Sequence, residues 1–211
     1  MKKPLAALLL ALAGTPLAWA DGLQSLAQFL QNARSGSAAF TQTVTAPPRA
    51  GEVAAPKVSS GHFAFERPGR FSFVYDKPFA QSIIADGRTL WLYDEDLNQV
   101  TERAQDQALG ATPAALLATA PDMAALRAEF TLDNAPDADG LHWVLATPKA
   151  ADGQIRNVRV GFAGQQLAAL DIEDSFGQHS LIRFEGLQTN TPLPAATFRF
   201  TPPAGADVLR Q

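Results

Sequence analysis

Two kinds of apolar spacing divide the chain. Directly after residue 20, apolar residues recur at intervals of three, one and four, which places them on one stripe of an amphipathic helix. Asp21 stands where the N-cap of this helix is expected. From Ala38 onward the period changes to two over most of the remaining length, which is typical of strands that bury one face. The helical stripe consists of Leu23, Leu26, Ala27 and Leu30.

About a dozen segments show the alternation, and short links rich in Gly, Pro and Asp join them. Such links suit antiparallel hairpins, and the pattern contains no crossover helices of the kind that a parallel sheet needs. A sheet of so many strands tends to curl, so we predict a mainly β fold that forms a barrel or half-barrel. The predicted strands are 38–44, 61–66, 70–75, 81–86, 89–94, 98–103, 129–133, 141–147, 157–163, 167–174, 180–186 and 197–201.

Between Ala104 and Arg127 the alternation is lost and the sequence becomes rich in Ala and Leu. The pairs Thr112–Pro113 and Pro121–Asp122 are typical helix starts, so we predict two short apolar helices here. They either cap one end of the core or form a movable lid. Residues 45–60 contain three prolines and no apolar period, which predicts a hairpin loop between the first two strands.

Phenylalanines gather on one predicted face of the sheet. Phe63 and Phe65 share a face on one strand, as do Phe71, Phe73 and Tyr75 on the next. The chain has 13 Phe but only 3 Trp and 2 Tyr, so most of its rings lack a polar group and suit a dry interior. This face is either the packed core of a β protein or the wall of a ligand cavity. The pattern continues at Val158, Val160, Phe162, Ile182, Phe184, Phe198 and Phe200.

Candidate catalytic and metal-binding groups are sparse. His62, His142 and His179 fall on separate predicted strands without metal-ligand spacing, so we expect them to be exposed strand residues. The acidic clusters 94–96 and 171–174 are interpreted as charged turns and not as an acid–base pair. No nucleophile elbow, phosphate loop or dinucleotide fingerprint occurs, and without cysteine there is no thiol nucleophile. We therefore predict that the protein is not an enzyme and has no catalytic residues, cofactor or metal.

The first twenty residues, MKKPLAALLLALAGTPLAWA, have the layout of a secretory signal peptide. Lys2 and Lys3 precede an apolar stretch that is shorter than the ~20 residues of a membrane span. Small residues, Ala18 and Ala20, stand at its end, so we expect cleavage after Ala20. Of the 211 residues, 191 would remain, which is within the usual size of a single domain, here 21–211.

Charge and cysteine content narrow the class of partner. Without Lys2 and Lys3, 15 of the 17 basic residues remain against 21 acidic ones, a formal charge of about −6 that argues against nucleic acid and anionic membranes as partners. The chain has no cysteine for a disulfide, nor the N-terminal cysteine that a bacterial lipoprotein needs for its acyl chains. We expect a soluble periplasmic monomer.

Five segments considered together resemble the LolA family of periplasmic outer-membrane lipoprotein carriers. Their order and spacing match over essentially the whole chain after residue 20. The resemblance implies an incomplete, half-open antiparallel β-barrel with a hydrophobic cavity covered by a helical lid. The segments are AAFTQTV (38–44), GHFAFERPGRFSFVYDKP (61–78), IIADGRTLWLYDEDLNQVT (83–101), ATPAALL (111–117) and TFRFTPPAGADV (197–208).

The resemblance also implies a function. Such a carrier accepts lipoproteins released by an inner-membrane ABC transporter, shields their acyl chains in the cavity and passes them to an outer-membrane lipoprotein receptor. Arg67, before Pro68, corresponds to the family's arginine that hydrogen-bonds the lid when the cavity is empty. A carrier or sensor of another lipid, such as a glycolipid or acyl group, remains the alternative on the same fold. The implied cavity and lid residues are Phe63, Phe65, Phe71, Phe73, Leu92, Leu116, Leu117 and Ala118.

Overall fold

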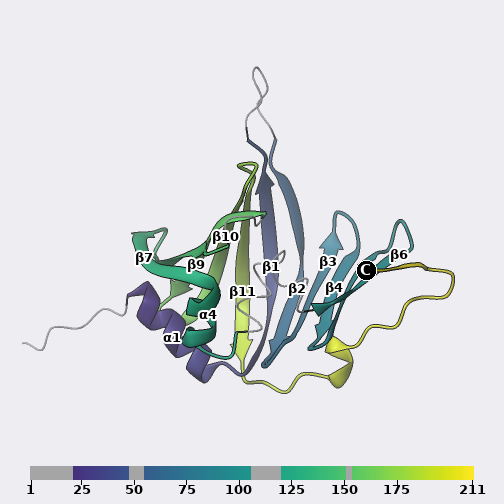
Figure 1. Ribbon diagram of the computed structural model, residues 1–211, viewed down its shortest axis with the longest axis horizontal. Helices are drawn as coiled ribbons and strands as arrows, with labels where there is room; N and C mark the ends of the chain where they lie inside the picture. The colour runs from purple at the N-terminus through teal and green to yellow at the C-terminus, as the bar shows by residue number, and fades with distance from the viewer. Residues whose placement is uncertain (1–20, 48–54, 106–119, 151–153) are drawn as a thin grey trace, which may run out of the picture.

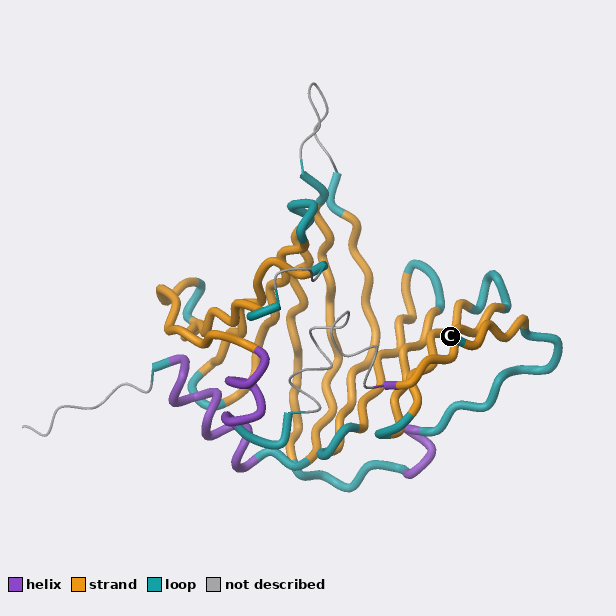
Figure 2. Tube along the Cα trace, viewed as in Figure 1, coloured by secondary structure: helices purple, strands orange, loops and turns teal. Residues whose placement is uncertain are grey.

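The computed structural model describes residues 21–47, 55–105, 120–150 and 154–211 (Figures 1 and 2). The strands are β1 (Ser35–Thr45), β2 (Lys57–Glu66), β3 (Arg70–Lys77), β4 (Gln81–Asp86), β5 (Thr89–Asp94), β6 (Gln99–Ala104), β7 (Phe130–Ala138), β8 (Leu141–Pro148), β9 (Ile155–Ala163), β10 (Gln166–Asp174), β11 (His179–Thr189) and β12 (Asp207–Arg210). They form one sheet in the order β12-β6-β5-β4-β3-β2-β1-β11-β10-β9-β8-β7. Its two edge strands do not pair with each other, so the predicted half-open barrel is confirmed.

Two helices lie against one face of this sheet. The first, α1 (Gly22–Asn32), begins at Asp21, whose carboxylate accepts the Gln24 N–H at 2.8 Å, as the sequence predicts. The second, α4 (Met123–Glu129), begins at Asp122, which caps it in the same way and confirms the helix expected there. The helix start expected at residues 112–113 lies outside the described residues, as does the predicted signal peptide.

The helices leave their polar sides exposed. Buried Leu26, Phe29 and Leu30 of α1 pack into the core shared with β7 to β10, and α4 contributes Leu126 beside β7.

Within the part of the chain that the structure describes, no helix is long and apolar enough to cross a membrane.

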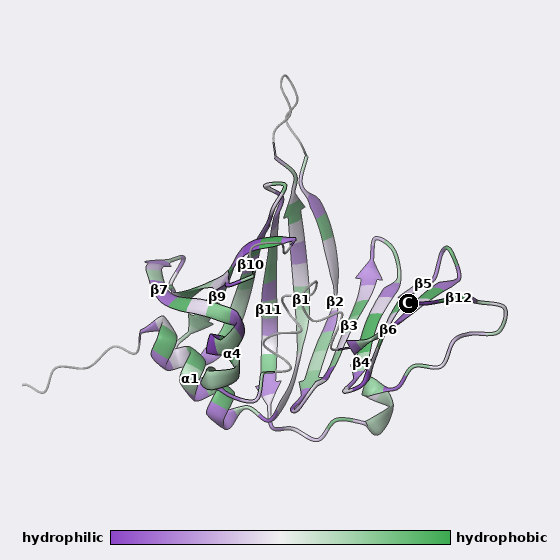
Figure 3. Cartoon of the chain, viewed as in Figure 1, coloured by the Kyte–Doolittle hydropathy of each residue, from purple (hydrophilic) through white to green (hydrophobic). Residues whose placement is uncertain are grey.

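Strand pairing arranges the apolar side chains in rows across the face that the helices cover. Residues opposite each other on neighbouring strands project to the same side. Gly36 leaves room for the Phe65 ring, because a Cβ there would lie 2.6 Å from a ring carbon. Alternating apolar and polar bands are visible along the strands in Figure 3. One row is Leu92, Ile83, Phe73, Phe63 and Ala38, and the next is Leu90, Ala85, Phe71, Phe65 and Gly36.

The second half of the sheet continues this core and confirms the predicted apolar face there. Phe184 pairs with Phe40 of β1 and links the two halves. The ring of Phe29 on α1 then contacts Phe65 on one side and Phe162 on the other, with centroids 5.8 and 6.0 Å away. The other core members of this half that the sequence pattern predicted are Val158, Val160 and Ile182.

The C-terminal segment corrects the prediction of a strand at 197–201. Residues Ala195–Phe198 form a short 3-10 helix, η2, and only β12 joins the sheet, in parallel with β6 instead of antiparallel. Prolines cannot donate a hydrogen bond to a sheet ladder, and four of them stand around this segment. They are Pro192, Pro194, Pro202 and Pro203.

The same segment corrects the predicted position of two aromatic residues. Phe200 contacts Trp91 and Tyr93, with ring centroids 6.2 and 5.6 Å away. These β5 residues alternate with Leu90 and Leu92 and therefore project from the opposite, convex face. Phe198 is buried there too, beneath the Arg70 guanidinium. The prediction that Phe198 and Phe200 extend the concave face is wrong, because they cover the convex one.

The first hairpin is also longer than predicted. β1 continues to Thr45 and β2 begins at Lys57, so residues 57–60, expected in a loop, are strand residues paired with β1. Residues 48–54 of the predicted loop lie outside the described residues.

Gly61 provides a test of the register between β2 and β3. The register shifts beside it, and a Cβ at this position would lie 1.9 Å from the Val74 carbonyl oxygen. We expect Gly61→Ala to lower the free energy of unfolding by ~1–3 kcal/mol, as overpacking does, in urea titrations. Ser60→Ala is the control, since Ser60 already has a Cβ, and should change stability by less than about 0.5 kcal/mol. Equal stability of the two variants would contradict this register.

Candidate functional site

Arg67 lies at the end of β2, where the chain turns toward β3. Its backbone N–H donates to the Arg34 carbonyl at 2.8 Å, which extends the pairing with the start of β1. Gly69 completes the turn with a φ of 81°, a conformation that favours glycine. Only 8% of Arg67 is exposed, so its charged group is buried at this end of the half-barrel.

The guanidinium of Arg67 connects three elements. Its Nη1 donates to the carbonyl oxygen of Ala33, at the end of α1, at 2.5 Å. Its Nε donates to the carbonyl oxygen of Ala120, just before α4, at 3.2 Å. The same group lies 5.2 Å from the Phe29 ring centroid and 5.0 Å from that of Phe65, in cation–π range. A planar guanidinium suits this position, because it donates at its edges while its faces contact rings.

The charge on Arg67 is retained despite this burial. Desolvation, with a smaller contribution from neighbouring Arg34, lowers the pKa of Arg67 to about 10. The side chain is therefore protonated at neutral pH, and the carbonyl oxygens and rings around it replace part of its lost hydration.

A second side chain fixes the turn that follows Arg67. Gln105, directly after β6, is buried; its Nε2 donates to the Gly69 carbonyl at 2.6 Å and its Oε1 accepts the Gly87 N–H at 2.9 Å. One amide thus joins the β2–β3 turn to the β4–β5 turn. Sequence reasoning missed Gln105, since no local motif marks a glutamine that reaches two distant turns.

The predicted aromatic residues are brought together next to Arg67. Phe63, Phe65, Phe71 and Phe73 are all buried, and the rings of Phe63 and Phe73 lie 4.5 Å apart. Leu92 is half-buried and packs against the same cluster. The three predicted lid residues lie outside the described residues; they are Leu116, Leu117 and Ala118.

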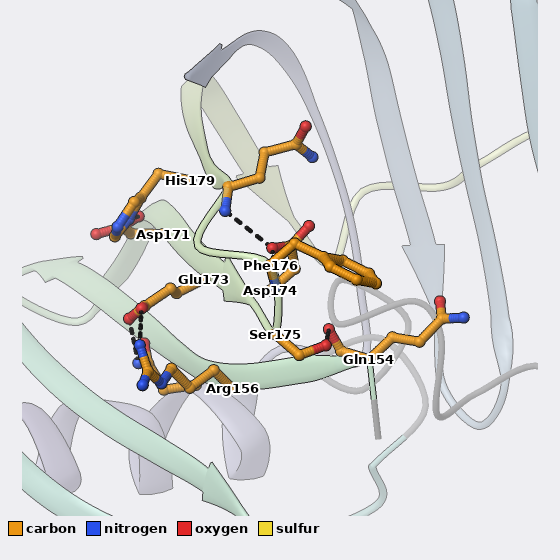
Figure 4. A network of polar contacts seen from close by, with 10 residues as sticks. Gln154, Arg156, Asp171, Glu173, Asp174, Ser175, Phe176 and His179 are labelled. Carbon is orange, nitrogen blue, oxygen red and sulfur yellow. Dashed lines mark hydrogen bonds and ion pairs between the residues drawn. The ribbon is translucent and has the colours of Figure 1, made fainter. Parts of the chain in front are cut away.

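The polar groups of the convex face form ion pairs between strands (Figure 4). The cluster 94–96 lies at the β5–β6 turn as predicted, but Asp171 and Glu173 are within β10, which corrects the interpretation of 171–174 as a turn. Glu173 accepts from Arg156 at 2.8 Å and from Asn157 at 2.7 Å. The hydrogen bond from Arg156 is the main cause that lowers the pKa of Glu173. Alternation along β10 explains the error, because it places both carboxylates opposite polar residues of β9.

Each histidine lies beside a carboxylate. His62 and His179 are exposed, as predicted, whereas His142 is half-buried. Among the residues that the structure describes, no group of His, Asp or Glu is arranged to hold a metal ion. A ring nitrogen of His62 lies 3.3 Å from the Asp76 carboxylate. The corresponding distances are 2.9 Å from His142 to Asp137 and 3.6 Å from His179 to Asp171.

The sequence has close relatives in several bacteria. A family model described as "Outer membrane lipoprotein carrier protein LolA" matches residues 31–201. An outer-membrane lipoprotein carrier protein of Albidiferax ferrireducens is 60% identical over 199 residues, covering 92% of this chain and 93% of the relative. One from Leptothrix cholodnii is 53% identical over 206 residues, covering 97% and 93%.

A solved structure supports the fold alone. An uncharacterized conserved protein from Thermus thermophilus aligns with a TM-score of 0.51 and 11% sequence identity, and the alignment covers 90% of this chain and 98% of that one.

Replacement of Arg67 by lysine tests the connection between helices and sheet. An ammonium keeps the charge but lacks the planar fork that reaches Ala33 and Ala120 while contacting both rings. We expect Arg67→Lys to lower the free energy of unfolding by ~1–2 kcal/mol in urea titrations. Arg88→Lys is the control, because Arg88 is exposed in the β4–β5 turn, and it should change stability by less than about 0.5 kcal/mol. Equal losses in both variants would argue against the connection.

Proposed function

Because the chain belongs to the LolA family of outer membrane lipoprotein carrier proteins, we propose that it is a periplasmic carrier of lipoproteins. The identity of 60% to a relative of that name, over nearly the whole of both chains, is the observation on which this proposal depends most. The cargo's acyl chains are held against the concave face, whose wall includes Phe63, Phe65, Phe71, Phe73 and Leu92.

The energetics of acyl chains make such a face necessary. Exposing an acyl chain to water costs ~0.8 kcal/mol per methylene, so a lipoprotein with several long chains does not cross an aqueous space unshielded. The concave face offers buried rings without polar groups over several neighbouring strands. It is occupied by packed side chains of α1 and the sheet in this conformation, so acyl chains enter by displacing helical side chains from the sheet.

Arg67 is proposed as the latch of the empty, closed state. Its hydrogen bonds to Ala33 and Ala120 hold the segments before β1 and before α4 to the end of β2. Each bond from this charged group contributes a net ~1.5–3 kcal/mol, and desolvation of the buried guanidinium offsets part of it, so the latch is modest and reversible. By stabilising the empty state it lowers the affinity for cargo, which favours release.

The partners follow from the carrier role. An inner-membrane ABC transporter delivers the lipoprotein, and an outer-membrane lipoprotein receptor accepts it because it offers the acyl chains an equal or better environment. In this proposal the chain acts as a monomer and a single domain, 21–211, after signal-peptide cleavage following Ala20.

The nature of the cargo is tested by mass spectrometry of molecules that copurify with the protein from the periplasm. We expect triacylated lipoproteins, because the concave face excludes water from long acyl chains. A free glycolipid as the only copurified species would favour the alternative lipid carrier on the same fold, and contradict the lipoprotein assignment.

The latch is tested by Arg67→Leu. This variant should load with lipoprotein as the wild type does, while its transfer to receptor-bearing outer membranes falls severalfold, because the empty closed state has lost its stabilising hydrogen bonds. Loading and transfer are followed separately with a labelled lipoprotein. Arg88→Leu serves as the control, since Arg88 is exposed in the β4–β5 turn. Normal transfer by Arg67→Leu would refute the role of Arg67.

A further inference from the structure

The end of the half-barrel opposite Arg67 is a rim of hairpin turns (Figure 1). Arg67 pairs at the start of β1, whereas the other end of that strand, Thr45, pairs with His179 beside the β10–β11 turn. Three of the turns at this rim present a large apolar side chain to solvent. They are Phe79 between β3 and β4, Leu97 between β5 and β6, and Phe176 between β10 and β11, which are 69%, 70% and 81% exposed.

The backbone of one of these turns is firmly held. The Asp174 carboxylate accepts the N–H groups of Phe176 and Gln178, and the Ser175 N–H donates to the Gln154 carbonyl (Figure 4). Exposed apolar side chains indicate a binding site when they gather in one place, and Phe79 and Leu97 line one pocket together.

A pocket of about 470 Å³ opens between two of the exposed side chains, Phe79 and Leu97. Its lining combines apolar groups with two amides, two hydroxyls and two carboxylates, and it includes no cationic side chain among the described residues. Carboxylates and amides are poor neighbours for an acyl chain but suit a peptide that bears positive charge. The lining consists of Gln42, Ser59, Tyr75, Pro78, Phe79, Gln81, Asp94, Asp96 and Leu97.

The pocket is continuous with the aromatic concave face. Tyr75 lines it, and the Tyr75 ring meets Phe40 edge-on with centroids 5.0 Å apart. Phe40 in turn contacts Phe73, at 5.5 Å. Gln42 follows two residues after Phe40 on the same face of β1 and donates to the Ser180 hydroxyl at 2.6 Å. The polar pocket therefore begins where the apolar face ends.

We propose that this rim pocket binds the cargo's own polypeptide, in the segment that follows its acylated cysteine, and that it favours segments with Lys or Arg beside apolar residues. The inference rests on the carrier function proposed above. In this arrangement the acyl chains contact the concave face and the peptide crosses the rim. The acylated cysteine, where lipid and polypeptide meet, then lies near Gln42 and Tyr75. Asp94 and Asp96 supply the charge complementarity.

Two synthetic lipopeptides test the preference on the intact protein. Both carry the same tripalmitoylated cysteine and a serine, followed by four lysines in one and four glutamates in the other. We expect the lysine form to bind about three- to tenfold more tightly at low ionic strength, as two ion pairs near the surface allow. The ratio should shrink in about 0.5 M salt, because salt screens exposed charges.

Two charge reversals in the same turn form the matched pair of variants. Asp96 and its neighbour Glu95 are both exposed, but only Asp96 lines the pocket. Asp96→Lys should abolish the preference for the lysine lipopeptide, and Glu95→Lys should retain most of it. Equal effects would show a response to net charge alone and overturn the pocket as the site.

The outcomes of these binding experiments distinguish a failure of the peptide site from a failure of the proposed carrier function. If neither lipopeptide binds, the carrier function itself fails. If both bind with equal affinity, the carrier function stands and the peptide site is overturned. If Asp96→Lys leaves the preference intact but slows transfer to receptor-bearing membranes, the pocket serves the receptor, which also overturns the inference.

Discussion

A sheet that curls without closing leaves a concave apolar face to be covered, and the rest of this structure meets that constraint. The strand register gathers the phenylalanines on one side, and α1 lays Phe29 against rings from both halves of the sheet. The guanidinium of Arg67 then holds the end of α1 and Ala120, just before α4, to the end of β2. The helices α1 and α4 are therefore attached to the sheet by a few hydrogen bonds and by apolar packing. Both can be broken and formed again, as reversible binding of a ligand on the concave face requires.

The sequence predicted the features that depend on local rules. Helix caps at Asp21 and Asp122 and the alternation of strands β1 to β11 are readable because each depends on neighbours in the chain. A period of two, however, does not say which face of a sheet a residue occupies. Phe198 and Phe200 were therefore assigned to the wrong face, which only their tertiary contacts with β3 to β5 determine.

The residues of the candidate site also fall into two groups, those that a local sequence pattern predicts and those that only tertiary contacts bring together. The aromatic wall followed from alternation, and Arg67 was identified only through the family resemblance, since an arginine before a proline is otherwise an ordinary turn residue. Gln105 and the rim pocket were missed because they depend on long-range approach of turns: Gly69 and Gly87 meet through Gln105, and Asp96 meets Phe79 through the β3–β4 and β5–β6 hairpins.

The parallel pairing of β12 with β6 has a consequence for the behaviour of many copies together. An open sheet has two edges, and an unpaired edge strand is a template for association with another chain. β12 pairs with β6 and itself becomes the edge strand, but it has only four residues, and so short an edge strand offers little backbone for pairing with another chain. The opposite edge, β7, is interrupted by Pro136, by a register shift between Ala135 and Ala138, and by the charges of Asp133 and Asp137. Both edges are thus protected against strand-to-strand aggregation. The half-barrel can leave its concave face accessible to a ligand without offering an edge strand to other copies of the chain.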